Sequence, residues 1–145
     1  MRCAGRAAQA GDVPIGALLA VDGVTFEAWN EKEARPDPTA HAEMIALAQA
    51  ARALGRWRIG GTLYVTKEPC AMCAGAIAAA RIERLVFGCS DPKGGAAGGV
   101  IDLLASPVLN HRVAVTRGVL AEETAAQLRA FFASRRDSGH GASTE

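Results

Sequence analysis

The sequence predicts a single α/β domain in which helices cover both faces of a sheet. Two observations support this prediction. Segments rich in apolar and β-branched residues alternate along the chain with segments rich in alanine and leucine, a pattern typical of layered α/β domains. A length of 145 residues is that of one domain rather than two, and the chain contains no internal repeat. We therefore expect a three-layer arrangement of helices, sheet and helices.

Five segments have the composition of strands. The first is a nearly continuous apolar run, which is typical of a strand buried on both faces. Asp22-Gly23 follows it and predicts a tight hairpin turn into the second strand. The third segment, Thr62 to Thr66, is rich in β-branched and aromatic residues, which favour strands. The predicted strands span residues 13–21, 24–29, 62–66, 84–88 and 113–116.

Helical segments separate most of these strands. Thr39 is a suitable N-cap for the second helix, and Pro69 opens the third. The last helix is amphipathic and is followed by polar residues, which we expect to form a disordered tail. The predicted helices span residues 2–10, 40–54, 70–80, 100–105 and 120–136, so the domain covers residues 1–136 and the tail residues 137–145.

Charge and cysteine content limit the class of protein. A formal net charge of +1 neither requires nor excludes a nucleic-acid partner. The four cysteines, at positions 3, 70, 73 and 89, do not form the framework of a disulfide-rich protein, and free thiols suit a reducing compartment. No apolar run reaches membrane-spanning length, and the first residues do not resemble a signal peptide. We expect a cytoplasmic protein without a membrane partner.

Two short motifs carry the candidate chemistry, His41-Ala42-Glu43 and Pro69-Cys70-Ala71-Met72-Cys73. One imidazole and two thiolates are good ligands for zinc, and a catalytic zinc keeps its fourth position open for water. Glu43 is a poor fourth ligand beside two cysteines, but it is well placed to accept and return protons. This order of motifs is typical of zinc-dependent nucleobase deaminases. Both motifs lie at predicted helix starts, where the helix dipole is expected to lower the pKa of both thiols.

Each motif taken alone has another interpretation. A His-Ala-Glu sequence in an alanine-rich helix can be a chance surface feature, and a Cys-x-x-Cys pair can be a redox centre or half of a structural zinc knuckle. A redox centre, however, would leave His41 and Glu43 without a role. A zinc-stabilised binding module would need no carboxylate beside the metal. The two motifs together therefore favour a catalytic zinc site.

Beyond these motifs, the chain resembles the bacterial tRNA-specific adenosine deaminases of the TadA family. The resemblance implies the cytidine-deaminase-like fold, with a five-stranded mixed sheet in three layers, and a homodimer. It implies one zinc ion per chain, held by His41, Cys70 and Cys73, with Glu43 as the proton shuttle. The implied reaction converts adenosine to inosine at the wobble position of a tRNA anticodon stem-loop. The resemblance extends from Met1 to about Arg136 and is carried by residues 12–17, 29–30, 37–43, 62–66, 68–76, 86–88, 95–98 and 110–113.

The resemblance also implies which residues contact the substrate. In the family, the counterpart of Asn30 contacts the flipped base, and the counterpart of the loop at 91–94 touches the RNA around the target nucleotide. The family's counterparts of the segment at 110–112 and of the C-terminal helix at 131–136 border the anticodon loop. The expected substrate-binding residues are Asn30, Asp91, Lys93, Asn110, His111, Arg112, Phe132 and Arg135. From the residues alone, Asn30 would simply start a loop, residues 91–99 would be a flexible connector, and at least one ring of the Phe131-Phe132 pair would be buried in the core.

Two departures from the family concern the substrate and the first helix. The first helix is short, with glycines at 5 and 11, and lacks the aromatic lead-in customary in the family. Gly94 follows Lys93 where the family often has Thr or Ser.

Two alternative substrates remain, a free nucleobase or nucleoside and single-stranded DNA. The basic and aromatic C-terminal helix argues against the first of them, because such side chains suit single-stranded nucleic acid.

Overall fold

Five strands form one mixed sheet in the computed structural model, which describes residues 1–140. The strands are β1 (Gly16–Val21), β2 (Val24–Trp29), β3 (Thr62–Lys67), β4 (Arg84–Cys89) and β5 (Ala114–Thr116). The helices are α1 (Arg2–Gln9), α2 (Ala42–Leu54), α3 (Ala71–Ala79) and α4 (Ala121–His140), with a 3₁₀ turn, η1, at Leu103–Ala105.

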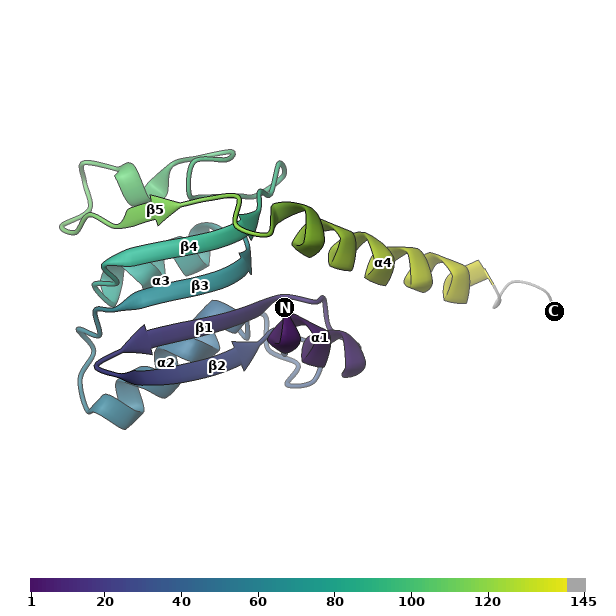
Figure 1. The fold of residues 1–145 in the computed structure, drawn as a ribbon, viewed down its shortest axis with the longest axis horizontal. Coiled ribbons are helices and arrows are strands. Elements are labelled where there is room, and N and C mark those ends of the chain that lie inside the picture. The colour runs from purple at the N-terminus through teal and green to yellow at the C-terminus, as the bar shows by residue number, and fades with distance from the viewer. Residues whose placement is uncertain (141–145) are drawn as a thin grey trace.

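The order of the strands across the sheet is β2-β1-β3-β4-β5 (Figure 1). Strand β1 is antiparallel to both of its neighbours, whereas β3, β4 and β5 are parallel to one another. Figure 1 shows α2 and α3 behind the sheet and α4 extending away from it. Helix α1 contacts β1 and β2. Helix α4 contacts β4 and β3. The predicted three-layer fold with a five-stranded mixed sheet is confirmed.

The hydrophobic core joins the sheet to α2 and α3. The central strands contribute Leu19, Leu63 and Phe87, all almost completely buried, and α3 contributes Ile77. Alanines fill most of the remaining buried positions of the two helices, so that the helix backbones lie close to the sheet. This close packing holds the first turns of α2 and α3 in fixed positions at the edge of the core.

A buried carboxylate orders the loop that leads from β2 to α2. Asp12 is 1% exposed, and its two carboxylate oxygens accept hydrogen bonds from the backbone N–H groups of Glu33 (2.9 Å) and Ala34 (3.2 Å). The N–H of Glu31 donates to the carbonyl of Ala40 at 2.9 Å, which closes the loop. These hydrogen bonds fix the conformation of the loop and therefore the position of His41, the residue that follows it.

Several predicted boundaries differ from the structure. Helix α2 begins at Ala42, and its N-cap is His41, not Thr39. The N–H and hydroxyl of Thr39 both donate to Asp37 Oδ1, at 2.8 and 2.7 Å, and these hydrogen bonds hold Thr39 in a local turn that precedes the helix. The predicted helix over 100–105 is only the turn η1. Helix α4 continues to His140, so residues 137–140 are helical where a tail was predicted, and residues 141–145 lie outside the described part of the chain.

Two further features agree with the sequence. Cys3, Cys70, Cys73 and Cys89 are all free thiols. Within residues 1–140, every helix is too short or too polar to cross a lipid bilayer.

A pair of glycines provides a test of the sheet packing. Both Gly55 and Gly61 have positive φ angles, of 66° and 75°. A methyl group at Gly55 would meet nothing, whereas one at Gly61 would strike the Ala20 carbonyl and lie 2.7 Å from Val21 Cβ in β1. We expect Gly55→Ala to lower the free energy of unfolding by about 1–2 kcal/mol, through backbone strain alone. Gly61→Ala should cost a further 1–3 kcal/mol or so, because β1 must shift. Urea unfolding measures both, and equal losses would contradict the packing of Gly61 against β1.

Candidate metal and catalytic site

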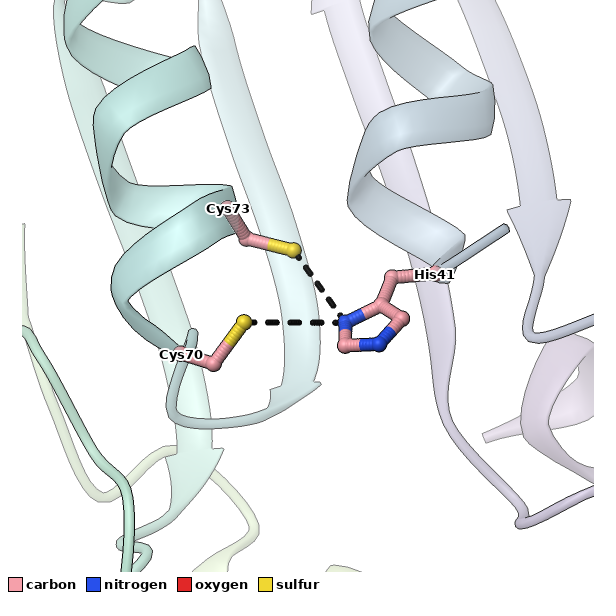
Figure 2. A group of neighbouring side chains, drawn as sticks. All are labelled: His41, Cys70 and Cys73. Carbon is pink, nitrogen blue, oxygen red and sulfur yellow. Dashed lines mark hydrogen bonds between the residues drawn. The ribbon is translucent and has the colours of Figure 1, made fainter. Parts of the chain in front are cut away.

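The starts of α2 and α3 bring three potential metal ligands together. His41 is the N-cap of α2, Cys70 is the N-cap of α3, and Cys73 lies in the first turn of α3. Figure 2 shows the two sulfurs and the imidazole pointing toward one another from the two helix starts. Pro69, which has no N–H and a restricted φ, lies directly before Cys70 and favours a chain that is extended at this point.

The separations of these ligand atoms suit a tetrahedral metal ion. His41 Nδ1 lies 3.6 Å from Cys70 Sγ and 3.4 Å from Cys73 Sγ. All three ligand atoms lie within 4.8 Å of one another. Zinc bonds of about 2.3 Å to sulfur and 2.0 Å to nitrogen at tetrahedral angles give a sulfur–nitrogen separation of about 3.5 Å. The donor set and its spacing therefore fit a metal site of the kind that zinc occupies.

The two thiols have opposite pKa shifts. Hydrogen bonds from Cys73 and His41 lower the pKa of Cys70 to about 3. The hydrogen bond to Cys70 and burial raise the pKa of Cys73. The hydrogen bond with Cys70 also raises the pKa of His41. The expectation of a lowered pKa for both thiols therefore holds for Cys70 alone, and the site places negative charge where a cation would bind.

Glu43 lies in the first turn of α2, beside the ligands. Glu43 is 4% exposed, and burial raises the pKa of its carboxyl group. A carboxyl group with a raised pKa exchanges protons near neutral pH more readily than an ordinary glutamate does. Glu43 also lines the cavity described next. Its position suits the proton-transfer role that the motif predicts.

A cavity of about 290 Å³ opens at the ligands. Among the predicted substrate-binding residues, Asn30, Asp91 and Phe132 line it, together with His41, Glu43 and Cys70. Lys32, Lys67 and Glu68 also line the cavity, and sequence reasoning missed all three. Lys67 and Glu68 directly precede Pro69-Cys70, and this position was their only signal in the sequence.

Asn30 has the features of a substrate contact. It is 2% exposed, and its Nδ2 donates to the carbonyl of Val13 at 3.4 Å. Its Oδ1 is buried and has no hydrogen-bond partner. An unpaired buried acceptor is costly, and it therefore marks a place where a ligand donor can bind.

The other predicted substrate-binding residues lie outside the cavity lining. His111 Nε2 lies 2.6 Å from the carbonyl oxygen of Ile82, and the Arg112 guanidinium donates to the carbonyl of Ala105 at 3.0 Å. Arg135 donates to the carbonyl of Gly11 and lies over the ring of Phe131. The residues outside the lining are Lys93, Asn110, His111, Arg112 and Arg135.

The phenylalanine pair of α4 is more exposed than predicted. Phe131 is half-buried and Phe132 is 45% exposed, so the expectation that at least one ring is buried in the core is wrong. The two rings meet edge to face with their centroids 5.5 Å apart. The reason is that α4 leaves the sheet, so its later turns have no core to pack against (Figure 1). Phe132 is thereby free to line the cavity.

Comparisons with known proteins show which family the chain belongs to. Residues 1–136 match the MafB19-like deaminase family. A tRNA-specific adenosine deaminase of Bacillus subtilis (strain 168) is 47% identical over 133 residues, which cover 90% of this chain and 83% of that protein. A solved structure from a study of A-to-I editing by tRNA:A34 deaminases at the wobble position of transfer RNA has a TM-score of 0.84 and 42% identity, covering 88% of this chain and 94% of that one. A guanine deaminase from Nitrosomonas europaea, with a TM-score of 0.73, 21% identity and coverage of 91% and 80%, shares the fold.

Proposed function

This chain belongs to the MafB19-like deaminase family, among the tRNA-specific adenosine deaminases, and from that premise we propose that it converts adenosine to inosine in a tRNA anticodon stem-loop, at the wobble position. The observation that carries the proposal is the buried carboxyl group of Glu43 beside a histidine and two cysteines, at the wall of a cavity. The names of the relatives support tRNA as the substrate.

We propose that His41, Cys70 and Cys73 hold one zinc ion per chain. When bound, zinc lowers the pKa of a water molecule toward neutrality and so supplies the nucleophile at ordinary pH. Glu43 is not needed as a ligand, which leaves its carboxylate available for proton transfer.

Glu43 moves the protons of the reaction. The net reaction adds water at C6 of adenine and releases ammonia, which leaves inosine. The Glu43 carboxylate accepts a proton from the attacking water and delivers it to the ring nitrogen next to C6. It then accepts the proton of the new C6 hydroxyl and passes it to the amine, so that the C6–N bond breaks, ammonia leaves and C6 becomes a carbonyl. The low exposure of Glu43 keeps bulk water away from these transfers.

Asn30 is proposed to hold the base during the reaction. We expect Asn30→Ala to raise KM for an RNA stem-loop roughly tenfold, because the buried amide offers a hydrogen bond to the base that alanine lacks. Steady-state kinetics at fixed zinc measures this change. Asn110→Ala is the matched comparison, since Asn110 is also an asparagine but lies outside the cavity lining. An unchanged KM in Asn30→Ala would contradict the role proposed for Asn30.

We also propose that two copies of the chain pair and that the protein acts in the cytoplasm. The segment between β4 and β5 supports pairing, because it exposes Val100, Ile101 and Val108, the last of them 81% exposed. Free thiols that act as metal ligands suit a reducing compartment. Sedimentation equilibrium should give twice the mass of one chain, and the mass of a single chain at micromolar concentration would contradict pairing.

A panel of substrates tests the proposed function. The substrates are an RNA anticodon stem-loop with adenosine at the wobble position, the same loop in DNA, free adenosine and free guanine. Inosine from the RNA loop, with little product from the others, is the expected result. Product from a free base or nucleoside alone, or from the DNA loop alone, would support the corresponding alternative instead.

A further inference from the structure

Glu68 is a buried carboxylate that the proposed chemistry does not use. It lies in the turn between β3 and α3, is 3% exposed, and lines the cavity beside Cys70. Its Oε2 accepts a hydrogen bond of 2.9 Å from the N–H of Asp91, and its Oε1 has no hydrogen-bond partner. Burying a carboxylate with so few partners is costly. The position therefore calls for a function that compensates for this cost.

The segment from Asp91 to Gly99 is folded around this carboxylate. A methyl group at Gly95 would collide with Glu68 Oε2, and one at Gly99 would collide with both carboxylate oxygens. At Gly99 the three nearest atoms to such a methyl group all belong to Glu68. Neither glycine has a positive φ, so the backbone conformation does not require glycine there. The two glycines instead leave room for Glu68.

The same segment presents Asp91 to the cavity. Asp91 Oδ1 accepts hydrogen bonds from the N–H groups of Lys93 (2.9 Å) and Gly94 (3.2 Å), and Oδ2 lies 3.2 Å from Lys67 Nζ. The N–H of Ala96 donates to the carbonyl of Pro69 at 2.8 Å. The segment is thus attached at both of its halves to the turn that carries Cys70.

We propose that Glu68 is a positioning residue, which holds the segment 91–99 against the turn that carries Cys70, so that Asp91 faces the substrate. The inference rests on the proposed function and extends it to a residue that is neither a proposed metal ligand nor the proposed proton shuttle. Glu68 acts through Asp91: the backbone hydrogen bond sets the position of Asp91, and the packing against Gly95 and Gly99 sets the path of the chain that follows.

Kinetics of Glu68 variants provide the first test. We expect Glu68→Ala to raise KM for the RNA stem-loop roughly tenfold while kcat falls less than about threefold and the zinc content stays that of the wild type. Glu68→Gln should restore most of the loss, because its amide oxygen can still accept the N–H of Asp91. Glu123→Ala, at an exposed glutamate of α4, is the control for mutation at a distant surface. An unchanged KM in Glu68→Ala, or loss of its zinc, would overturn the inference.

A double-mutant cycle provides the second test and does not depend on one variant alone. In the wild-type background, Gly99→Ala should raise KM about as much as Glu68→Ala does, because the methyl group displaces the carboxylate. In the Glu68→Ala background, Gly99→Ala should add little, since its collision partner is gone. Additive effects would overturn the inference. The wild type is assayed first, and its failure to make inosine from the RNA loop would contradict the proposed function itself.

Discussion

Glu43→Gln should lower the rate of inosine formation by at least about 10²- to 10⁴-fold while leaving the fold and the zinc content unchanged. Glutamine has the shape of glutamate and keeps its hydrogen-bonding oxygen, but it cannot carry the proton between water, ring and amine. Glu43 is 4% exposed, so bulk water has little access to replace it. Single-turnover measurements with saturating enzyme isolate this chemical step from RNA binding.

Two controls make the Glu43 result specific. The variant should bind the RNA stem-loop as tightly as the wild type, because the substitution changes neither the cavity shape nor Asn30. Its zinc content, measured by elemental analysis, should remain one ion per chain. A single-turnover rate within tenfold of the wild-type rate would remove Glu43 from the role of proton shuttle.

The second large effect is expected at the metal ligands. Cys73→Ser should lose both zinc and turnover, because a serine hydroxyl is a much weaker zinc ligand than a thiolate. It should also unfold at a lower temperature, since a metal that binds only the folded chain stabilises it. Cys73 is completely buried in the first turn of α3, so no other side chain can easily take its place. Elemental analysis and thermal unfolding with and without a chelator measure both effects.

Cys89→Ser is the matched control for the metal ligands. Cys89 is also buried, but it lies in β4 and its Sγ donates to the carbonyl of Thr66 at 3.7 Å, a hydrogen bond that serine can replace. The Cys89→Ser variant should keep its zinc and its turnover. Zinc retained by Cys73→Ser at the wild-type level would contradict the assignment of Cys73 as a ligand.

Hydrophobic pattern was sufficient to predict most of the fold. The strand β2 begins and ends where predicted, because Asp22-Gly23 marks the turn before it and a charged loop follows Trp29. Helix boundaries were less predictable, because they depend on competition between local hydrogen bonds. Thr39 has the right side chain for an N-cap, but its hydrogen bonds to Asp37 hold it in a turn that precedes the helix. At the other end of the chain, the polar residues 137–140 show no apolar pattern, yet they extend α4 without a helix-breaking proline.

The candidate site likewise has features that the sequence could predict and features that it could not. His41, Cys70 and Cys73 were predictable because a metal demands particular side chains at particular spacings, and the structure brings them together. Contacts between segments that are far apart in the sequence produce no such pattern of residue types and spacings. Nothing in the sequence indicates that Glu68 fits against Gly95 and Gly99. Nor does it indicate that the ring of His111 contacts a carbonyl of the chain rather than lining the cavity.

The most direct test of the account is to measure inosine at the wobble position of an RNA anticodon stem-loop. The zinc-loaded wild type is compared with the same protein after chelation and after zinc is restored, and the product nucleosides are identified by mass spectrometry. We expect stoichiometric inosine at the wobble position with zinc, none after chelation, and recovery when zinc is returned. Wobble adenosine left unchanged by folded protein that carries one zinc ion per chain would contradict it.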